Sequence, residues 1–574
     1  MRRAVLAMVL CAVPLLCASA DASQDLLDRR LLRDALRVKA GPAGPGTVVA
    51  LPLPEPAEVR ASASAAGELT RIARGRGPQH VLVGVRTHRH VPGVARVLRS
   101  LGAQPESFTT IAVVAATVPS GAALAGALGA DPRVAYVERD TEMRIAADPF
   151  DAPDPAHGNL KFTWFFDDVR AGEALAAAGG GSSRTVAVLD TGLDTSHPEL
   201  AGRVERVYDT QAGGSDVTDF VGHGTFVSGL IAAIDGNGLG GKGVAGNTRI
   251  LAIRASRDGT FTERDVLRGT EFAVRHGADV LNLSLAGDVI DASVARALGA
   301  AFVNDVLPVA ASGNRGLAGN PVQFPAAVLG GQRGAPGIGL SVGATRPNGT
   351  VAEFSTHNDF VSLAGPGASA SDCRFGVLST LPAAAVTAWD SVESCSNVFS
   401  QGGARYAYGQ GTSFAAPIVS GIAALVWQVE RRLASEQVAE VLIRSARQTL
   451  GSGWNEFTGA GIVDGAAATA LARVYDVRAP RAKAGVRRRG GRVRVRLVKT
   501  RDRTDAGREL AGAVTYGLLV SRNGGRSFSI VRRRPRPFKH TVRLRGRRVN
   551  VLVASACDGN GNCDFKRLGR FRRG

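Results

Sequence analysis

Apolar and polar stretches alternate regularly between residues 184 and 477. Short apolar runs, each typical of a buried strand, alternate there with segments at 264–276 and 292–304 that predict helices. The runs lie at residues 185–190, 249–255, 279–285, 307–314 and 340–344. Alternating strands and helices favour an α/β fold with a doubly wound, mostly parallel sheet that binds ligands beyond the carboxyl ends of its strands. Helical segments at 413–431 and 435–449 complete this unit.

The stretches on either side have other patterns. Residues 80–140 combine strand-like apolar runs with short helical segments, which predicts a compact α+β module. After residue 478, short strand-like runs and the hairpin signal RNGG predict a small β-sandwich. The expected domains are a flexible spacer at 21–79, the α+β module at 80–146, the α/β unit at 160–477 and the β-sandwich at 478–574.

Residues 1–20 are typical of a secretory signal peptide. Arg2 and Arg3 give a basic start, residues 4–17 are mostly apolar, and the small residues ASA at 18–20 resemble a signal cleavage site. No later segment reaches the roughly 18 consecutive apolar residues that a membrane-spanning helix needs. We therefore expect a secreted, extracellular protein without a transmembrane segment in its mature form.

Removal of the signal peptide leaves Cys373, Cys395, Cys557 and Cys563. An even number of cysteines in an oxidising compartment predicts disulfide bonds. Nearness in sequence favours Cys373 with Cys395 and Cys557 with Cys563, although four cysteines allow three pairings. A metal site is not favoured, because no CxxC pattern or nearby histidine pair accompanies these cysteines.

The positive charge is confined to the C-terminal module. Residues 478–574 contain 29 Lys and Arg against 5 Asp and Glu, a net charge of +24, so the rest of the chain carries −4 of the total +20. Such a module could bind an anionic cell-surface polymer, a nucleic acid or a membrane surface. Alternating arginines are equally typical of the solvated face of a strand, and both interpretations stay open at this point.

Three polar residues stand at positions that suggest chemistry. Asp190 ends an apolar run, His223 begins a helical segment, and Ser413 lies between small residues and another helical segment. Taken singly, each favours a structural role, as a cap, a turn residue or a structural histidine. Together they indicate nucleophilic catalysis, because a serine hydroxyl attacks when a base takes its proton and a carboxylate orients that base. The chain order Asp, His, Ser is one of the known orders.

Five sequence blocks resemble the signature blocks of the subtilisin-like serine proteases, the subtilase family. They are VAVLDTGLDTSHPEL, GHGTFVSG, NLSLAG, VAASGN and GTSFAAPIVSG, and the resemblance covers about 184–471. It implies a secreted serine endopeptidase that hydrolyses peptide bonds through an acyl-enzyme intermediate. Asp190 would orient the base, His223 would act as general base and then acid, Ser413 would be the nucleophile, and Asn314 would stabilise the oxyanion.

The resemblance also implies contacts for the protein or peptide substrate. An extended substrate would add a strand to the enzyme, and its first pocket would be lined by small, uncharged residues. The residues assigned to substrate binding are Ser284, Leu285, Ala286, Gly287, Ala311, Ser312 and Gly313. The chemistry requires no cofactor. A structural calcium ion would bind Glu199, Asp235 and Asn237, with a metal-free turn as the equal alternative.

The α+β module resembles the inhibitory propeptide of these proteases, especially in HVLVGV and DPRVAYVERD. The protein would therefore be made as a zymogen that carries its own inhibitor. We expect autocleavage between about residues 141 and 157.

Some residues depart from the family pattern. Phe226 stands where many members have a second histidine, and Phe414 where the nucleophile block usually has methionine. The segment between LSTLP and YGQG, which contains Cys395, resembles an insertion. None of these departures removes a catalytic group. The alternative function is a catalytically silent relative whose basic C-terminal module makes it an anionic-surface-binding or adhesive protein.

Overall fold

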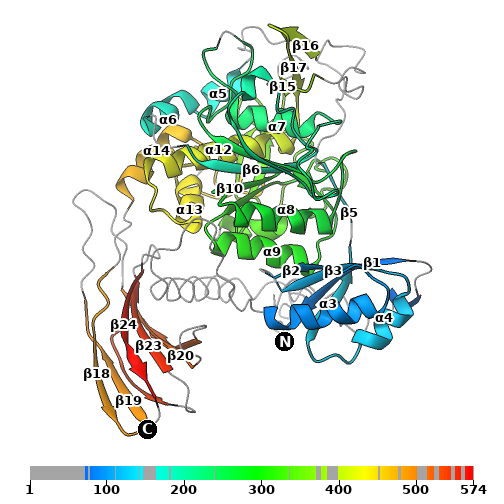
Figure 1. Cartoon of the computed structure of the whole chain (residues 1–574). Helices are drawn as coiled ribbons and strands as arrows, with labels where there is room; N and C mark the ends of the chain where they lie inside the picture. The colour runs from blue at the N-terminus through cyan, green and yellow to red at the C-terminus, as the bar shows by residue number, and fades with distance from the viewer. Residues whose placement is uncertain are drawn as a thin grey trace, which may run out of the picture.

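A computed structural model shows an N-terminal α+β module, a central α/β unit and C-terminal antiparallel sheets (Figure 1). It describes residues 72–74, 78–109, 112–140, 142–145, 163–179, 183–237, 239–334, 337–369, 376–383, 398–449, 453–475, 480–500, 514–522, 529–544, 550–557 and 563–572. The predicted signal peptide, most of the spacer, Cys373 and Cys395 lie outside these residues.

A seven-stranded parallel sheet forms the centre of the α/β unit. Its strand order is β14-β13-β12-β10-β6-β8-β7, and every neighbouring pair is parallel. The strands are β6 (Thr185–Asp190), β7 (Val204–Asp209), β8 (Arg249–Arg254), β10 (Val280–Leu283), β12 (Leu307–Ala311), β13 (Leu340–Thr345) and β14 (Leu363–Pro366). The predicted fold class is confirmed.

Helices cover both faces of this sheet. Helices α7 (His223–Ala232) and α12 (Thr412–Val429) pack on one face, and α8 (Glu263–Arg275) and α9 (Ala292–Val303) on the other (Figure 1). Successive residues of a strand point to opposite faces. Accordingly, Val188 of β6 joins the core that contains α7 and α12, and Leu189 joins the core that contains α8 and α9. The near-continuous apolar runs follow from burial on both faces.

Smaller elements complete the α/β unit. They are α5 (Trp164–Asp168), α6 (Ala171–Ala178), η2 (Pro198–Leu200), α10 (Ala326–Leu329), η3 (Gln332–Gly334), α13 (Ser435–Ser445) and α14 (Gly465–Val474). Strands β16 (Val398–Gln401) and β17 (Ala404–Gly409), which lie largely in the predicted insertion, form a three-stranded sheet with β15 (Val377–Leu381), in the order β15-β17-β16.

Helix α12 is long and apolar enough to cross a membrane, but 94% of that stretch is buried inside the protein. It lies between α7, α14 and the strands β10, β12 and β13. A helix that is apolar on all sides is expected where protein surrounds it. The burial of α12 in the core therefore accounts for its composition.

The N-terminal module is a four-stranded antiparallel sheet, in the order β2-β3-β1-β4, with two helices. Its elements are β1 (Gln79–Val85), η1 (His88–His90), α3 (Val91–Ser100), β2 (Glu106–Phe108), β3 (Val113–Val118), α4 (Gly121–Leu128) and β4 (Val134–Arg139). The sheet packs against α8 and α9 (Figure 1), since Leu82 and Phe108 belong to the same buried cluster as Leu267 and Val294 of these helices.

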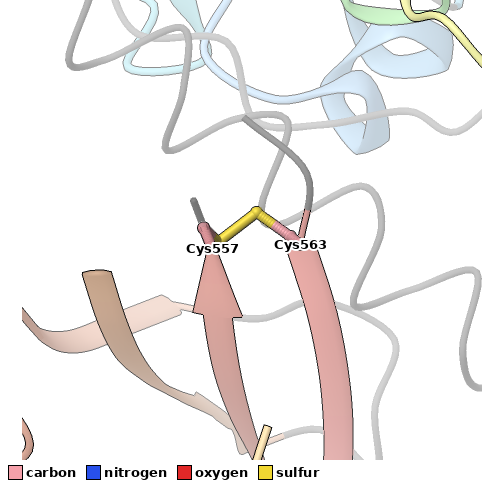
Figure 2. The surroundings of a disulfide bond; sticks show 2 residues. All are labelled: Cys557 and Cys563. Carbon is pink, nitrogen blue, oxygen red and sulfur yellow. A yellow bond between two sulfur atoms is a disulfide. The ribbon is translucent and has the colours of Figure 1, made fainter. Parts of the chain in front are cut away.

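Two antiparallel sheets form the C-terminal module, in the orders β18-β19-β22 and β21-β20-β23-β24. The strands are β18 (Ala484–Arg489), β19 (Arg492–Leu497), β20 (Thr515–Ser521), β21 (Ser529–Arg534), β22 (Lys539–Arg543), β23 (Asn550–Cys557) and β24 (Cys563–Phe571). Val495 of β19 and Leu518 of β20 share one core. A disulfide bond joins Cys557 to Cys563 at the ends of β23 and β24 (Figure 2), as sequence nearness favoured.

A buried ion pair links β7 to β8. Arg254 Nη2 donates to Asp209 Oδ2 at 2.7 Å, and both side chains are fully buried. We predict that Asp209→Ala lowers the free energy of unfolding by about 3 kcal/mol, because it leaves a buried guanidinium poorly compensated. This value is at the lower end of the stability loss expected when a buried ion pair is broken, because the exposed Asp216 still contacts Arg254 at 3.1 Å. Urea unfolding measures the change.

The double variant Asp209→Leu/Arg254→Met is the control. It removes both charges and should lose less stability than Asp209→Ala alone, because no buried charge is left behind. A loss below about 1 kcal/mol for Asp209→Ala would contradict the importance of this pair.

Candidate active site

Asp190 and His223 meet at the carboxyl edge of the parallel sheet. Asp190 is the last residue of β6 and His223 the first residue of α7, so the end of the strand faces the start of the helix. His223 Nδ1 lies 2.7 Å from Asp190 Oδ1, and both side chains are 1% exposed. Asp190 Oδ1 also accepts a hydrogen bond from the amide of Thr191 at 2.8 Å. The carboxylate therefore fixes the orientation of the imidazole.

Ser413 is the second residue of α12, and hydrogen bonds attach the start of this helix to the sheet. Pro417 has no amide hydrogen to donate to the carbonyl of Ser413, and Ser284 Oγ donates to that carbonyl at 2.7 Å instead. Asn282 of β10 donates from Nδ2 to Ser284 Oγ at 2.9 Å and accepts from Ser420 Oγ at 2.9 Å. Buried residues at the end of β10 therefore set the position of Ser413.

The two atoms that a serine nucleophile and its base would use have no hydrogen-bond partner. His223 Nε2 and Ser413 Oγ are both buried and unbonded among the described residues. The His223 ring lies 5.5 Å from the ring of Phe414, the neighbour of Ser413. The hydrogen bond between a catalytic serine and its histidine is often long in the absence of substrate and shortens when substrate binds.

Asn314 directs a free amide donor toward the same region. Its Oδ1 accepts from the backbone amide of Thr412 at 2.9 Å and from Thr412 Oγ1 at 2.8 Å. Two donors require an acceptor, so the other end of the amide is Nδ2, which is buried and has no described partner. The Thr412 hydroxyl also accepts from the Gly313 amide at 3.1 Å. Thr412 thus orients Asn314, a role that its sequence position did not reveal.

Asp219 is a second buried carboxylate that sequence analysis missed. It accepts hydrogen bonds from Thr191 Oγ1 at 2.9 Å, from the Gly222 amide at 2.8 Å, and from both the amide and the hydroxyl of Thr225 at 2.8 and 2.7 Å. These partners are next to Asp190 and His223 in the chain. Asp219 therefore holds together the two segments that carry the His–Asp pair.

The strand that leaves the N-terminal module lies between two strands of the α/β unit. β5 (Glu142–Ile145) pairs antiparallel with β11 (Leu285–Ala286) on one side and with β9 (Thr260–Thr262) on the other. The register places Leu285 opposite Ile145 and Ala286 opposite Arg144. An extended segment of this chain thus occupies the edge of β11, where the sequence placed an extended substrate, and also the edge of β9. Gly287, the next predicted contact, bridges to Phe324.

The residues predicted to line the first pocket follow β12. Ala311 is the last residue of that strand, and Ser312 Oγ donates to the Thr356 carbonyl at 2.9 Å. Gly313 has a φ of 107°, and a Cβ there would lie 1.8 Å from Gln323 Oε1. Glycine is therefore required at this position, and the chain reaches Asn314 through a conformation that larger residues rarely adopt.

The residues predicted for calcium do not fit a calcium site. Both Glu199 oxygens are taken, because Tyr406 OH and the Gly241 amide donate to Oε1 and Asn237 Nδ2 donates to Oε2. Asn237 turns its Oδ1 to the Leu239 amide at 2.9 Å. Asp235 is half exposed and pairs with Lys242 at 3.3 Å. Calcium needs six or more oxygen ligands, whereas Asn237 here presents its donor to the carboxylate.

The carboxyl groups of Glu138, Glu263 and Asp291 form an acidic cluster where β4 meets α8 and α9. Their nearest oxygens lie within 4.8 Å of one another, the one such group of three among the described residues. Glu138 accepts from the amides of Ala292 and Ser293 at 3.1 and 2.9 Å at the start of α9. Burial and then the charge of Asp291 raise the pKa of Glu138 to about 8. Burial also raises the pKa of Glu263 well above its ordinary value.

The N-terminal module also caps the neighbouring helix. Asp140 accepts from the Arg264 amide at 2.8 Å at the start of α8, and burial raises the pKa of Asp140 to about 6. Carboxylates are favoured at helix N-termini, where backbone amides are unpaired. The module therefore binds α8 and α9 through their exposed ends as well as through apolar contacts.

The two departures from the family pattern are neighbours in space. The rings of Phe226 on α7 and Phe414 on α12 have centroids 4.3 Å apart. A Cβ on Gly409 would contact both rings, at 2.9 and 2.5 Å. The two phenylalanines thus fill one volume behind His223 and Ser413, and neither replaces a group of the candidate site.

Comparisons with known proteins place the chain in a family. Residues 181–461 match the Subtilase family model. The chain is 34% identical over 269 residues to the thermophilic serine proteinase of Bacillus sp. (strain AK1), covering 46% of this chain and 57% of that protein. It is 33% identical over 344 residues to the alkaline protease of Alkalihalobacillus alcalophilus, covering 60% and 76%. It is also 32% identical over 290 residues to the major intracellular serine protease of Bacillus subtilis (strain 168), covering 48% and 80%. The chain therefore belongs to the subtilase family of serine endopeptidases.

Proposed function

We propose that Asp190, His223 and Ser413 are the catalytic triad of a secreted endopeptidase. One observation supports this most strongly. Asp190 holds His223 through Nδ1 at 2.7 Å, while His223 Nε2 and Ser413 Oγ remain unbonded among the described residues. The Nδ1 hydrogen bond selects the tautomer in which Nε2 is basic, and Nε2 is the atom that must take the serine proton.

The reaction proceeds in two halves. His223 Nε2 takes the hydroxyl proton as Ser413 Oγ attacks the peptide carbonyl carbon, and it returns that proton to the leaving amine, which gives an acyl-enzyme. In the second half His223 takes a proton from water, the resulting hydroxide attacks the acyl carbon, and the proton returns to Ser413 Oγ. Asp190 stabilises the imidazolium in both halves.

Asn314 stabilises the oxyanion that each attack produces. Its Nδ2 is held ready by Thr412, and the Ser413 amide at the start of α12 supplies a second donor. One such side-chain donor is worth about 3–4 kcal/mol, a magnitude measured in subtilisin. No step of this scheme requires a metal or an organic cofactor.

The N-terminal module acts as the inhibitory propeptide in this proposal. β5 fills the edges of β9 and β11 as a substrate strand would, and the acidic cluster and Asp140 attach the module to α8 and α9. Autocleavage between about residues 141 and 157 divides the chain into propeptide 80–146 and catalytic unit 160–477. Export rests on the signal-like residues 1–20, since one relative is named as intracellular.

Hydrolysis of casein by the processed protein tests the function. The wild-type protein should be active, and Ser413→Ala should lose nearly all activity, because the acyl-enzyme cannot form. A folded, processed wild-type protein without activity would favour the silent, surface-binding alternative.

The Thr412 hydroxyl provides a sharper test of the oxyanion site. We predict that Thr412→Val lowers kcat about tenfold to a hundredfold with little change in KM, because Asn314 loses the hydrogen bond that fixes its amide. Thr412→Ser keeps the hydroxyl and should retain most activity. An equal loss in both variants, or a change confined to KM, would show that the hydroxyl does not act through Asn314.

The first substrate pocket is assigned to the small residues Ala311, Ser312 and Gly313. Its lining predicts which substrate side chain is preferred just before the cleaved bond. A pocket without charge favours apolar or uncharged side chains over lysine and arginine. Profiling with a peptide library should therefore show cleavage mainly after uncharged residues. Dominant cleavage after basic residues would overturn this assignment.

The acidic cluster predicts that the propeptide is released as the pH rises. Glu138 titrates near pH 4.5 when free and near 8 in the complex, so association takes up a proton. The affinity of the propeptide for the catalytic unit is therefore highest below about pH 4.5. Between about pH 4.5 and pH 8 it falls by up to about tenfold per pH unit. Gel filtration of the processed, non-covalent complex between pH 5 and 9 measures the bound fraction.

Glu263→Gln is the matched variant for this prediction. It keeps the side-chain volume and an acceptor for the Asp291 amide while removing one acid from the cluster. Its complex should persist to a higher pH than the wild-type complex. Identical pH dependence in the two proteins would exclude the cluster as the cause of release.

A further inference from the structure

The outer face of the sheet β18-β19-β22 carries a regular array of cations, which we call the arginine face. The register aligns three rows: Arg489, Arg492 and Arg543; Arg487, Arg494 and Thr541; Gly485, Arg496 and Lys539. Seven of these nine positions are basic and none is acidic. Part of the +24 net charge of the C-terminal module thus lies on one sheet face.

The alternation along β19 separates this face from the core. Val493, Val495 and Leu497 are buried in the core shared with the other sheet, and the arginines between them are exposed. Arg487, Arg489, Lys539 and Arg543 on the neighbouring strands are exposed as well. The seven cations therefore stand side by side on a solvent-facing surface.

Without a bound anion, this arrangement of like charges destabilises the sheet. Like charges directly opposite each other on neighbouring strands destabilise a sheet. Arg492 has an arginine on either side, Arg489 and Arg543, and Arg494 faces Arg487. No acidic side chain among the described residues forms an ion pair with the arginine face. A solvated strand face does not need such a concentration of one sign, whereas an anion-binding surface does.

We propose that the arginine face binds a flexible, single-chain phosphodiester polymer of the cell surface. Six of the seven cations are arginines, whose planar guanidinium groups bind phosphate oxygens in pairs. Residues two apart along a strand are separated by about 6.7 Å, and neighbouring strands by about 4.8 Å, so cations recur evenly in both directions. A flexible chain of phosphates can follow such an array and contact several arginines at once.

Other polyanions fit this surface less well. The arginine face contains no aromatic ring on which nucleic-acid bases could stack. No large apolar side chain projects from the nine positions to enter a lipid layer. The proposal does not depend on the triad, but it does depend on export, where a cell-surface polymer would be met.

Binding of the full-length Ser413→Ala protein to immobilised poly(glycerol phosphate) tests the proposal. The logarithm of the binding constant should fall linearly with the logarithm of the salt concentration, as for phosphate contacts made by arginine. The triple variant Arg492→Gln/Arg494→Gln/Arg496→Gln should bind about tenfold or more weakly and reduce the salt slope by about 2. Its Tm should equal or exceed that of the parent, because repulsion across the strands is relieved.

A matched triple variant distinguishes binding by the arginine face from a general effect of net charge on affinity. Arg534→Gln/Arg567→Gln/Arg570→Gln removes the same charge from the other sheet and should change the affinity by less than about threefold. If the first variant fails to fold, Arg494→Gln alone should weaken binding by about threefold. The proposal would be overturned if the two triple variants lost affinity equally or if the parent protein did not bind. It would also be overturned if the parent protein bound a DNA duplex, polygalacturonate or phosphatidylglycerol vesicles more tightly than poly(glycerol phosphate).

Discussion

The attachment of the first turn of α12 to the carboxyl edge of the parallel sheet is the constraint on which the candidate site depends. Strands β12, β10 and β6 are neighbours, and they end next to Asn314, Ser284 and Asp190 in that order. The first two residues hold α12, through Thr412 and through the Ser413 carbonyl. The third holds the histidine of α7. A shift of the helix would displace the proposed nucleophile and the proposed oxyanion donors together.

Buried carboxylates perform two different tasks in this molecule. Asp190, through Oδ1, and Asp219, through both oxygens, are hydrogen-bonded within the α/β unit, so they act as fixed parts of the structure. Glu138, Glu263 and Asp291 meet across a contact between the N-terminal module and the rest of the chain. Three carboxyl groups cannot all be ionised in so small a buried volume. The contact is therefore stable while the cluster retains protons, which is consistent with the inhibitory role proposed for the N-terminal module.

The sequence predicted the parts of the fold that depend on local pattern. The five central strands are continuous apolar runs because helices cover both of their faces. Strand β7 was not predicted because its residues Val204–Asp209 are mostly polar and half exposed at the sheet edge. The Cys557–Cys563 bond was favoured because the two strands that it joins are adjacent in the chain.

Roles that depend on distant contacts could not be predicted. Thr412 and Asp219 look like ordinary turn or cap residues until Asn314, Thr191 and Thr225 are placed around them. The calcium residues were chosen by position in the family pattern, and the donors around Glu199 show why they do not fit. The arginine face required the register of three strands, because RVRVR alone is equally typical of a solvated strand.

The central claim is that His223 and Asn314 surround a reactive Ser413. Treatment of the processed, propeptide-free protein with a fluorophosphonate, followed by peptide mapping, tests it most directly. We expect a single label on Ser413 that is lost in the His223→Ala protein. A folded protein that takes no label, or takes it equally well without His223, would contradict an assembled triad.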